Sequence, residues 1–164
     1  MAKYVFGILV SNKAGVLTRV SSMFTRRGFN IDTLTVGATQ DPELSRITIS
    51  MVGDEYARSQ IIKQLDKMHD VKKVQAMEPD ETVTRELLLI KLKNAPETRQ
   101  DVLAAVNVFR SNIVDYSPDS LCIEITGETS KLDAFIELVR PFGIMEMCRT
   151  GLVALERGSG CMEI

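Results

Sequence analysis

The chain contains 164 residues, 45% of them hydrophobic and 26% charged, and it carries a formal net charge of −2. It is long enough for one or two domains with a sizeable core, and its balanced charge excludes the basic surface typical of nucleic-acid-binding proteins. No apolar run approaches the length of a membrane-spanning helix, and only a strand-length run follows Met1. We therefore expect a cytoplasmic protein without nucleic-acid or membrane partners.

Apolar residues in the first half alternate in some segments and recur with helical spacing in others. Asp41-Pro42-Glu43 is typical of a turn and predicts a hairpin between the second and third strands. The resulting β-α-β-β-α-β order is that of a ferredoxin-like domain, an antiparallel sheet with both helices on one face. The predicted elements are strand 4–10, a helix from Gly15 to Arg27 that Gly28 ends, strand 33–38, strand 46–51, a helix capped by Gly53-Asp54, and strand 71–77.

The same order recurs in the second half, after the acidic, proline-containing stretch Glu78-Pro79-Asp80-Glu81. Its predicted elements are strand 88–92, helix 102–109, a hairpin of 112–116 and 121–125, a helix opened by a capping box at 130–133, and a last strand 144–155. The fold class is therefore α+β, with two tandem ferredoxin-like (βαββαβ) domains at 1–78 and 83–164 and a linker at 79–82. Each half of about 80 residues would bury only somewhat over ~60% of its surface alone, so we expect docking to another copy.

No arrangement of residues indicates catalysis or metal binding. His69 is the only histidine and follows a predicted helix beside Asp70, as surface residues do. The three cysteines (Cys122, Cys148 and Cys161) are far apart and form no Cys-x-x-Cys pair, which argues against a disulfide framework and a zinc site. The sequence also lacks a phosphate-binding loop and a nucleophile elbow. We predict no catalytic and no metal-binding residue on this chain.

The junction between the first strand and the first helix is the strongest candidate for a binding site. Gly15 has no Cβ, so a ligand or a second chain can approach its backbone closely. The N–H groups of Gly15, Val16 and Leu17 would point out of the helix start, where a carboxylate is favoured. Asn30, or backbone carbonyls near Asn12, could accept hydrogen bonds from an ammonium group.

Together with an apolar recess, which Val16, Leu17 and Ile31 could shape, these groups would suit a free amino acid. The same residues also fit an ordinary strand–loop–helix corner. In that interpretation Asn12 is a turn residue and Asn30 a helix-exit residue. The residues alone leave both interpretations open.

The segments 12–17 (NKAGVL) and 24–31 (FTRRGFNI) resemble the ACT domain, an amino-acid-sensing regulatory module. A more specific resemblance extends from about Tyr4 to Arg157. RRGFNIDTLTV at 26–36, DPELSR at 41–46 with Gly53-Asp54, KLDAF at 131–135 and RTG at 149–151 resemble the small, regulatory subunit of bacterial acetolactate synthase.

This resemblance implies a non-catalytic subunit. A separate large subunit would condense pyruvate with a second 2-keto acid, using thiamine diphosphate, Mg²⁺ and FAD that this chain does not carry. The small subunit would activate it and confer feedback inhibition by a branched-chain amino acid, usually valine. The effector would lie between two ACT domains of a homodimer. By position, the implied effector residues are Asn12, Gly15 and Asn30, with Ala14, Val16, Leu17 and Ile31 as neighbours; Ala14 stands where many members have proline.

Two alternatives belong to other classes. The chain could be a free-standing amino-acid-binding module that serves a different enzyme or a transcription factor. Binding to the thiamine-dependent large subunit separates this alternative from a regulatory subunit. An enzyme in its own right is the third hypothesis, and turnover of pyruvate by this chain alone would support it.

Overall fold

The structure, a computed structural model, describes residues 1–162. The chain forms two compact units, one made of Met1–Val83 together with the segment from Leu152 onward, the other of Thr84–Gly151. Both units are βαββαβ domains, as the sequence predicted. The division differs from the predicted one near the C-terminus, because residues from Leu152 onward pack with the first unit.

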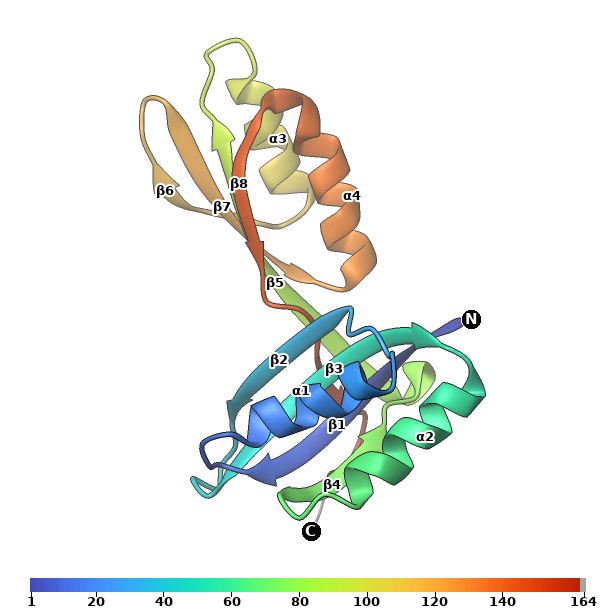
Figure 1. The fold of residues 1–164 in the computed structure, drawn as a ribbon. Coiled ribbons are helices and arrows are strands. Elements are labelled where there is room, and N and C mark those ends of the chain that lie inside the picture. The colour runs from blue at the N-terminus through green and yellow to red at the C-terminus, as the bar shows by residue number, and fades with distance from the viewer. Residues whose placement is uncertain (163–164) are drawn as a thin grey trace. The chain divides into compact units, whose positions relative to one another are not determined.

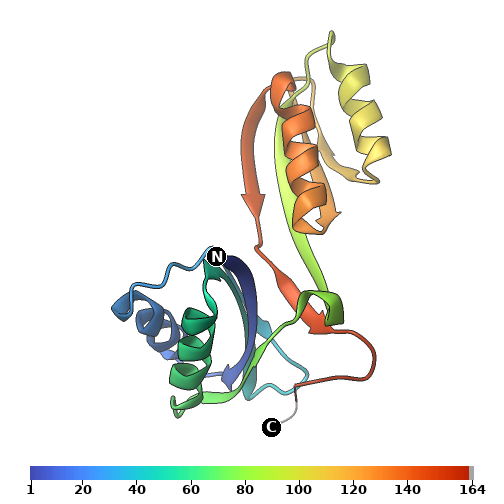
Figure 2. The same cartoon turned by 90° about the vertical axis from the view of Figure 1, so that its right-hand side faces the viewer.

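In the first unit the four strands pair antiparallel in the order β2-β3-β1-β4. Figures 1 and 2 show α1 and α2 together on one face of this sheet. The core lies between, because alternate strand residues such as Phe6, Ile8 and Ile49 meet the apolar faces of the helices. The elements are β1 (Ala2–Ser11), α1 (Val16–Arg26), β2 (Thr33–Ala38), β3 (Leu44–Gly53), α2 (Glu55–Asp66) and β4 (Val71–Ala76).

The caps predicted for the first unit are present. The Asp54 side chain accepts a hydrogen bond from the Ala57 amide at 2.8 Å and so starts α2. At the end of α1, the amide of Gly28 donates to Thr25 O and that of Phe29 donates to Phe24 O. Gly28 has φ +69°, so this end is a Schellman motif, which needs a residue in the left-handed region.

The second unit repeats the architecture with the strand order β6-β7-β5-β8 and with α3 and α4 on one face (Figure 2). A short helix, η1 (Pro79–Glu81), stands where the linker was predicted. The elements that follow are β5 (Thr82–Lys93), α3 (Arg99–Val108), β6 (Asn112–Tyr116), β7 (Ser120–Gly127), α4 (Thr129–Val139), η2 (Arg140–Phe142) and β8 (Ile144–Arg149). Its core centres on Ile90, Ile123 and Phe135.

Two details of the second half were predicted wrongly. The N-cap of α4 is Glu128 and its side chain makes no capping bond, so Ser130 lies inside the helix and forms no capping box. The expected last strand, 144–155, is divided into β8 and β9 (Val153–Glu156). Gly151 lies between them with φ +83°, a conformation that interrupts an extended strand. β9 pairs with β5.

Candidate functional site

The loop that joins β1 to α1 exposes backbone donors. Gly15 is the N-cap of α1, with φ +83°, and no side chain caps this helix. The Val16 amide makes a long 3.4 Å bond to Lys13 O, whereas within residues 1–162 the amides of Gly15, Leu17 and Thr18 have no hydrogen-bond acceptor. The helix dipole adds partial positive charge at this end. The start of α1 can therefore accept a carboxylate.

The turn between β2 and β3 holds Asn12 in place. Its amide donates to Glu43 O at 2.8 Å, and its Nδ2 donates to Pro42 O at 3.0 Å. These two bonds hold the loop against the hairpin. Because Nδ2 is engaged, the exposed side chain offers its Oδ1 as an acceptor.

Asn30 and Ile31 lie beyond the other end of α1. The Schellman motif turns the chain after Arg27, and Ile31 is half-buried against the first core. Asn30 is exposed, and within residues 1–162 its side chain makes no hydrogen bond. It therefore presents a free amide at the end of the helix opposite to Gly15.

The predicted residues thus form two groups rather than one cluster. The 11 residues of α1 span about 16 Å at about 1.5 Å per residue. That separation is too large for one amino acid to touch both Gly15 and Asn30 of the same chain. Gly15 and Asn30 of one chain therefore lie at opposite ends of α1.

The neighbouring side chains differ in what they can contribute. Val16 is 2% exposed and belongs to the core, so its side chain supports the loop from below. Leu17 is 42% exposed and offers apolar surface beside the free amides. Ala14 is exposed and provides little surface of its own.

Arg19 is a neighbour of this site that the sequence prediction missed. A Cβ added to Gly15 would lie 3.4 Å from Arg19 Nη1, and Arg19 Nη2 pairs with Asp70 at 2.6 Å. Residues four apart share one helix face, and this spacing was the available signal. A cation therefore lies beside the start of α1, which favours an anionic group there.

The remaining described residues show neither a metal-binding cluster nor a membrane-spanning helix. Within 1–162 no group of three or more His, Cys, Asp or Glu residues could hold a metal ion. None of the helices in that part of the chain is long and apolar enough to cross a membrane.

Comparisons with known proteins match both units. Residues 6–73 match the AHAS small subunit-like ACT domain, and residues 85–158 match the family described as small subunit of acetolactate synthase. The chain belongs to the acetolactate synthase small-subunit family. It is therefore a regulatory, non-catalytic subunit, and a large catalytic subunit is its partner.

The similarity covers nearly the whole chain. The probable acetolactate synthase small subunit of Methanothermobacter thermautotrophicus is 48% identical over 97% of this chain and 95% of the relative. The Bacillus subtilis acetolactate synthase small subunit is 42% identical over 96% of this chain and 92% of the relative. The crystal structure of the Thermotoga maritima small subunit covers 98% of this chain and 100% of that chain, with a TM-score of 0.92 and 40% identity. The tandem βαββαβ fold and the N-terminal ACT domain are thus confirmed.

Proposed function

We propose that this regulatory subunit binds a branched-chain amino acid, valine in the first instance, and makes the large subunit sensitive to it. The observation that carries the proposal is the uncapped start of α1, where three unsatisfied amides and a nearby arginine favour a carboxylate. Leu17 supplies apolar surface beside them. An affinity between millimolar and micromolar needs about 4–8 kcal/mol, which a ligand of this size can reach.

A homodimer would complete the site. A two-fold axis that sets the α1 helices of two copies antiparallel would bring Gly15 of one chain near Asn30 of the other. The first sheet offers a suitable edge, because β2 pairs only with β3 and its residues Val36, Gly37 and Ala38 are exposed. In such a dimer the amides of one chain would hold the carboxylate, while Asn30 of the other would accept from the ammonium group.

The binding step is tested by titrating valine, leucine and isoleucine calorimetrically into the purified chain. We expect saturable binding by one of them, and substitution Gly15→Asp should abolish it because the new carboxylate occupies the ligand's place. The same variant should still activate the large subunit.

A matched control is essential, because any side chain at Gly15 is strained by its φ of +83°. Gly15→Ala carries this strain without the charge, so it should weaken valine binding far less than Gly15→Asp. Equal losses in the two variants would mean that backbone strain alone explains the effect. Retention of full valine binding by Gly15→Asp would place the effector elsewhere.

The remaining chemistry of the complex belongs to the partner in this proposal. Thiamine diphosphate, Mg²⁺ and FAD would reside on the large subunit, with this chain holding none of them, and the complex would work in the cytoplasm. Metal and cofactor analysis of the purified chain, after expression without the large subunit, tests this part directly.

A further inference from the structure

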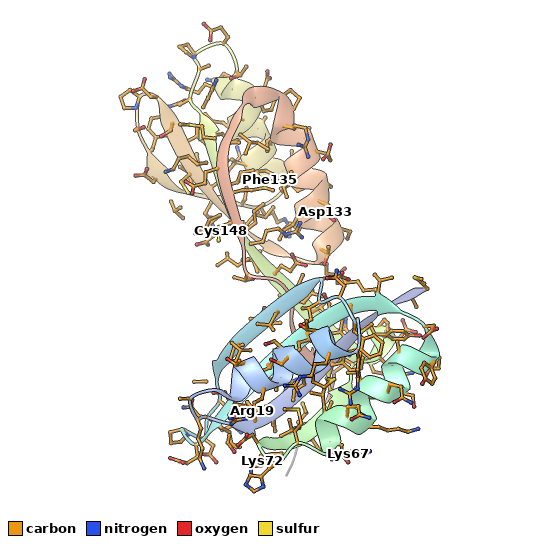
Figure 3. All side chains as sticks on the ribbon, in the orientation of Figure 1. Arg19, Lys67, Lys72, Asp133, Phe135 and Cys148 are labelled. Atoms are coloured by element: carbon orange, nitrogen blue, oxygen red, sulfur yellow. The ribbon has the colours of Figure 1, made fainter. Side chains whose placement is uncertain are left out.

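A groove of about 550 Å³ runs between α1 and α2, on the outer side of the helix layer of the first unit. Four cationic side chains line it: Arg19, Arg26 and Arg27 from α1 and its end, and Lys67 from the end of α2. Figure 3 labels Arg19 on α1 and Lys67 at the end of α2, which both line the groove. Among the described residues no carboxylate lines this groove.

Most of this positive charge is not neutralised by other residues in 1–162. Arg19 is paired with Asp70, and Arg27 Nη2 donates to the neutral Gln64 Oε1 at 2.8 Å. Arg26, Arg27 and Lys67 form no ion pair with any residue in 1–162. In a chain whose net charge is −2, this groove is a local concentration of positive charge.

The floor of the groove is apolar. Met23 is 7% exposed and Met68 is half-buried, and both line the space between the two helices. Methionine side chains adapt to the shape of a partner, and they are frequent at surfaces that bind amphipathic helices. A small free anion gains nothing from an apolar floor, whereas the apolar face of a protein segment can pack against it.

The spacing of the charges also favours an extended partner. Arg19 and Arg27 are eight residues apart, so their backbones are separated by about 12 Å along α1. Cations spread along two turns do not converge on a single phosphate or carboxylate. They match acidic side chains spaced along two turns of a facing helix.

The groove shares Arg19 with the surroundings of the proposed effector site, but Gly15, Leu17 and Asn30 do not line it. It lies on the side of α1 that faces α2, and α2 packs against β4. The edge proposed for the dimer, β2, is at the opposite end of the sheet from β4. A dimer formed along β2 would therefore leave the groove accessible.

We infer that this groove, the α1–α2 groove, docks an acidic amphipathic helix of the large catalytic subunit. The inference rests on the proposed function, because it assumes that this chain regulates such a partner. Docking here would place the partner against α1, the helix whose two ends bear the effector half-sites. Binding of the effector and binding of the large subunit would then both involve α1.

The test uses the purified large subunit and two double variants with the same change in charge. Arg26→Glu/Lys67→Glu reverses two exposed cations of the groove that form no ion pair within residues 1–162, and Lys3→Glu/Lys93→Glu reverses two exposed lysines that do not line it. We expect the groove variant to bind the large subunit at least about tenfold more weakly, with the control unchanged. The affinity of the unmodified chain should also fall as salt is raised, and that of the groove variant much less.

Each alternative has a distinct outcome. Equal affinity of the two double variants for the large subunit would overturn the inference. Tripolyphosphate serves as a probe for small polyanions. If the groove variant no longer binds tripolyphosphate but binds the large subunit as tightly as the unmodified chain, the inference is overturned in favour of a small polyanion. Valine titration of the same proteins separates the two proposals, because a groove variant that binds valine normally leaves the effector site untouched. If even the unmodified chain failed to bind the large subunit, the partner assumed in the proposed function would fall, and this inference with it.

Discussion

The first helices of the two units end in the same hydrogen-bonded pattern with different residues at the left-handed position. In α1 that position is Gly28, and in α3 it is Arg110, with φ +52°. The amide of Ser111 donates to Val106 O and that of Arg110 donates to Asn107 O, which completes a second Schellman motif. A left-handed conformation costs a non-glycine residue about 1–2 kcal/mol. Arg110 therefore holds a position that suits glycine better.

Arg110→Gly should accordingly stabilise the second unit. Relief of the left-handed strain is partly offset by the greater freedom of glycine in the unfolded chain, so we expect a gain of up to about 1 kcal/mol. Urea unfolding of the full chain measures it. Gly28→Ala is the converse variant and should lose about 1 kcal/mol, and a destabilised Arg110→Gly would show that the Arg110 side chain makes an undetected favourable contact.

Glu86 is the buried charge on which the second unit depends. It is 2% exposed, and its Oε2 accepts from Arg149 Nε at 2.9 Å and Nη2 at 2.5 Å, while Oε1 accepts from Thr129 Oγ1 at 2.6 Å. Arg149 also pairs with the exposed Asp133 at 2.7 Å. Desolvation of Arg149 lowers its pKa, but its bonds to Asp133 and Glu86 outweigh this, and the pKa is raised overall.

Arg149→Ala should destabilise the second unit by about 3–5 kcal/mol, because it leaves Glu86 buried without a cation. Adding Glu86→Gln should recover part of this loss, since the uncompensated charge is removed. Asp133→Ala removes only the exposed partner and should change stability by less than about 1 kcal/mol. Denaturant unfolding compares the variants, and a small effect of Arg149→Ala would mean that Glu86 gains water or another partner.

At the scale of elements, the C-terminal segment covers the face of the first sheet that lies opposite the helices. Arg46 Nη2 on β3 donates to Ala154 O on β9 at 2.9 Å, and Gln75 on β4 pairs with Glu156. Gly7 on β1 permits this approach, because an added Cβ would lie 3.0 Å from both Arg46 Nη2 and Met162 Sδ. Side chains from β3 and β4 thus hold β9 in place, and Gly7 on β1 leaves the space for it.

Arg46→Ala should loosen β9. Loss of a hydrogen bond from a charged donor removes about 1.5–3 kcal/mol, so amide hydrogen exchange in Val153–Glu156 should be about ten- to a hundredfold faster. Exchange measured by mass spectrometry on the full chain tests this. Arg85→Ala, at an exposed arginine 3.9 Å from Glu128, serves as the control. Unchanged protection of β9 would mean that its pairing with β5 is sufficient to hold it.

The sequence predicted the helices and hairpins because a strand with one buried face alternates in polarity, as the buried Leu121, Ile123 and Ile125 of β7 do with their less buried neighbours. It did not predict the break at Gly151, because a positive φ follows from tertiary packing. Nor did it predict the bond from Asn12 to Pro42 O, which joins residues 30 positions apart. The role of Gly15 as a helix start was predictable, since the switch from strand to helix periodicity occurs there.

At the scale of the whole molecule, the central claim is that two copies of the chain are needed to bind one amino acid. Its basis is the length of α1, about 16 Å, which separates the loop of Gly15 from the end of the helix that precedes Asn30. A site shared in this way couples ligand occupancy to the contact between copies, with coupling energies typically of about 1–3 kcal/mol. Feedback would follow if that contact also sets how the chain holds the large subunit.

The most direct test mixes two variants that are each defective. Gly15→Asp and Asn30→Ala should both lose valine binding as homodimers, since each damages one half of every site. When the two are unfolded together, refolded and titrated calorimetrically, the mixed dimer should regain one intact site, built from Gly15 of one chain and Asn30 of the other. Recovery of about a quarter of the wild-type sites, as expected if half the dimers are mixed and each bears one good site, is the predicted result. If the mixture binds no more valine than the separate variants, the amino acid is not held between two copies and the account is wrong.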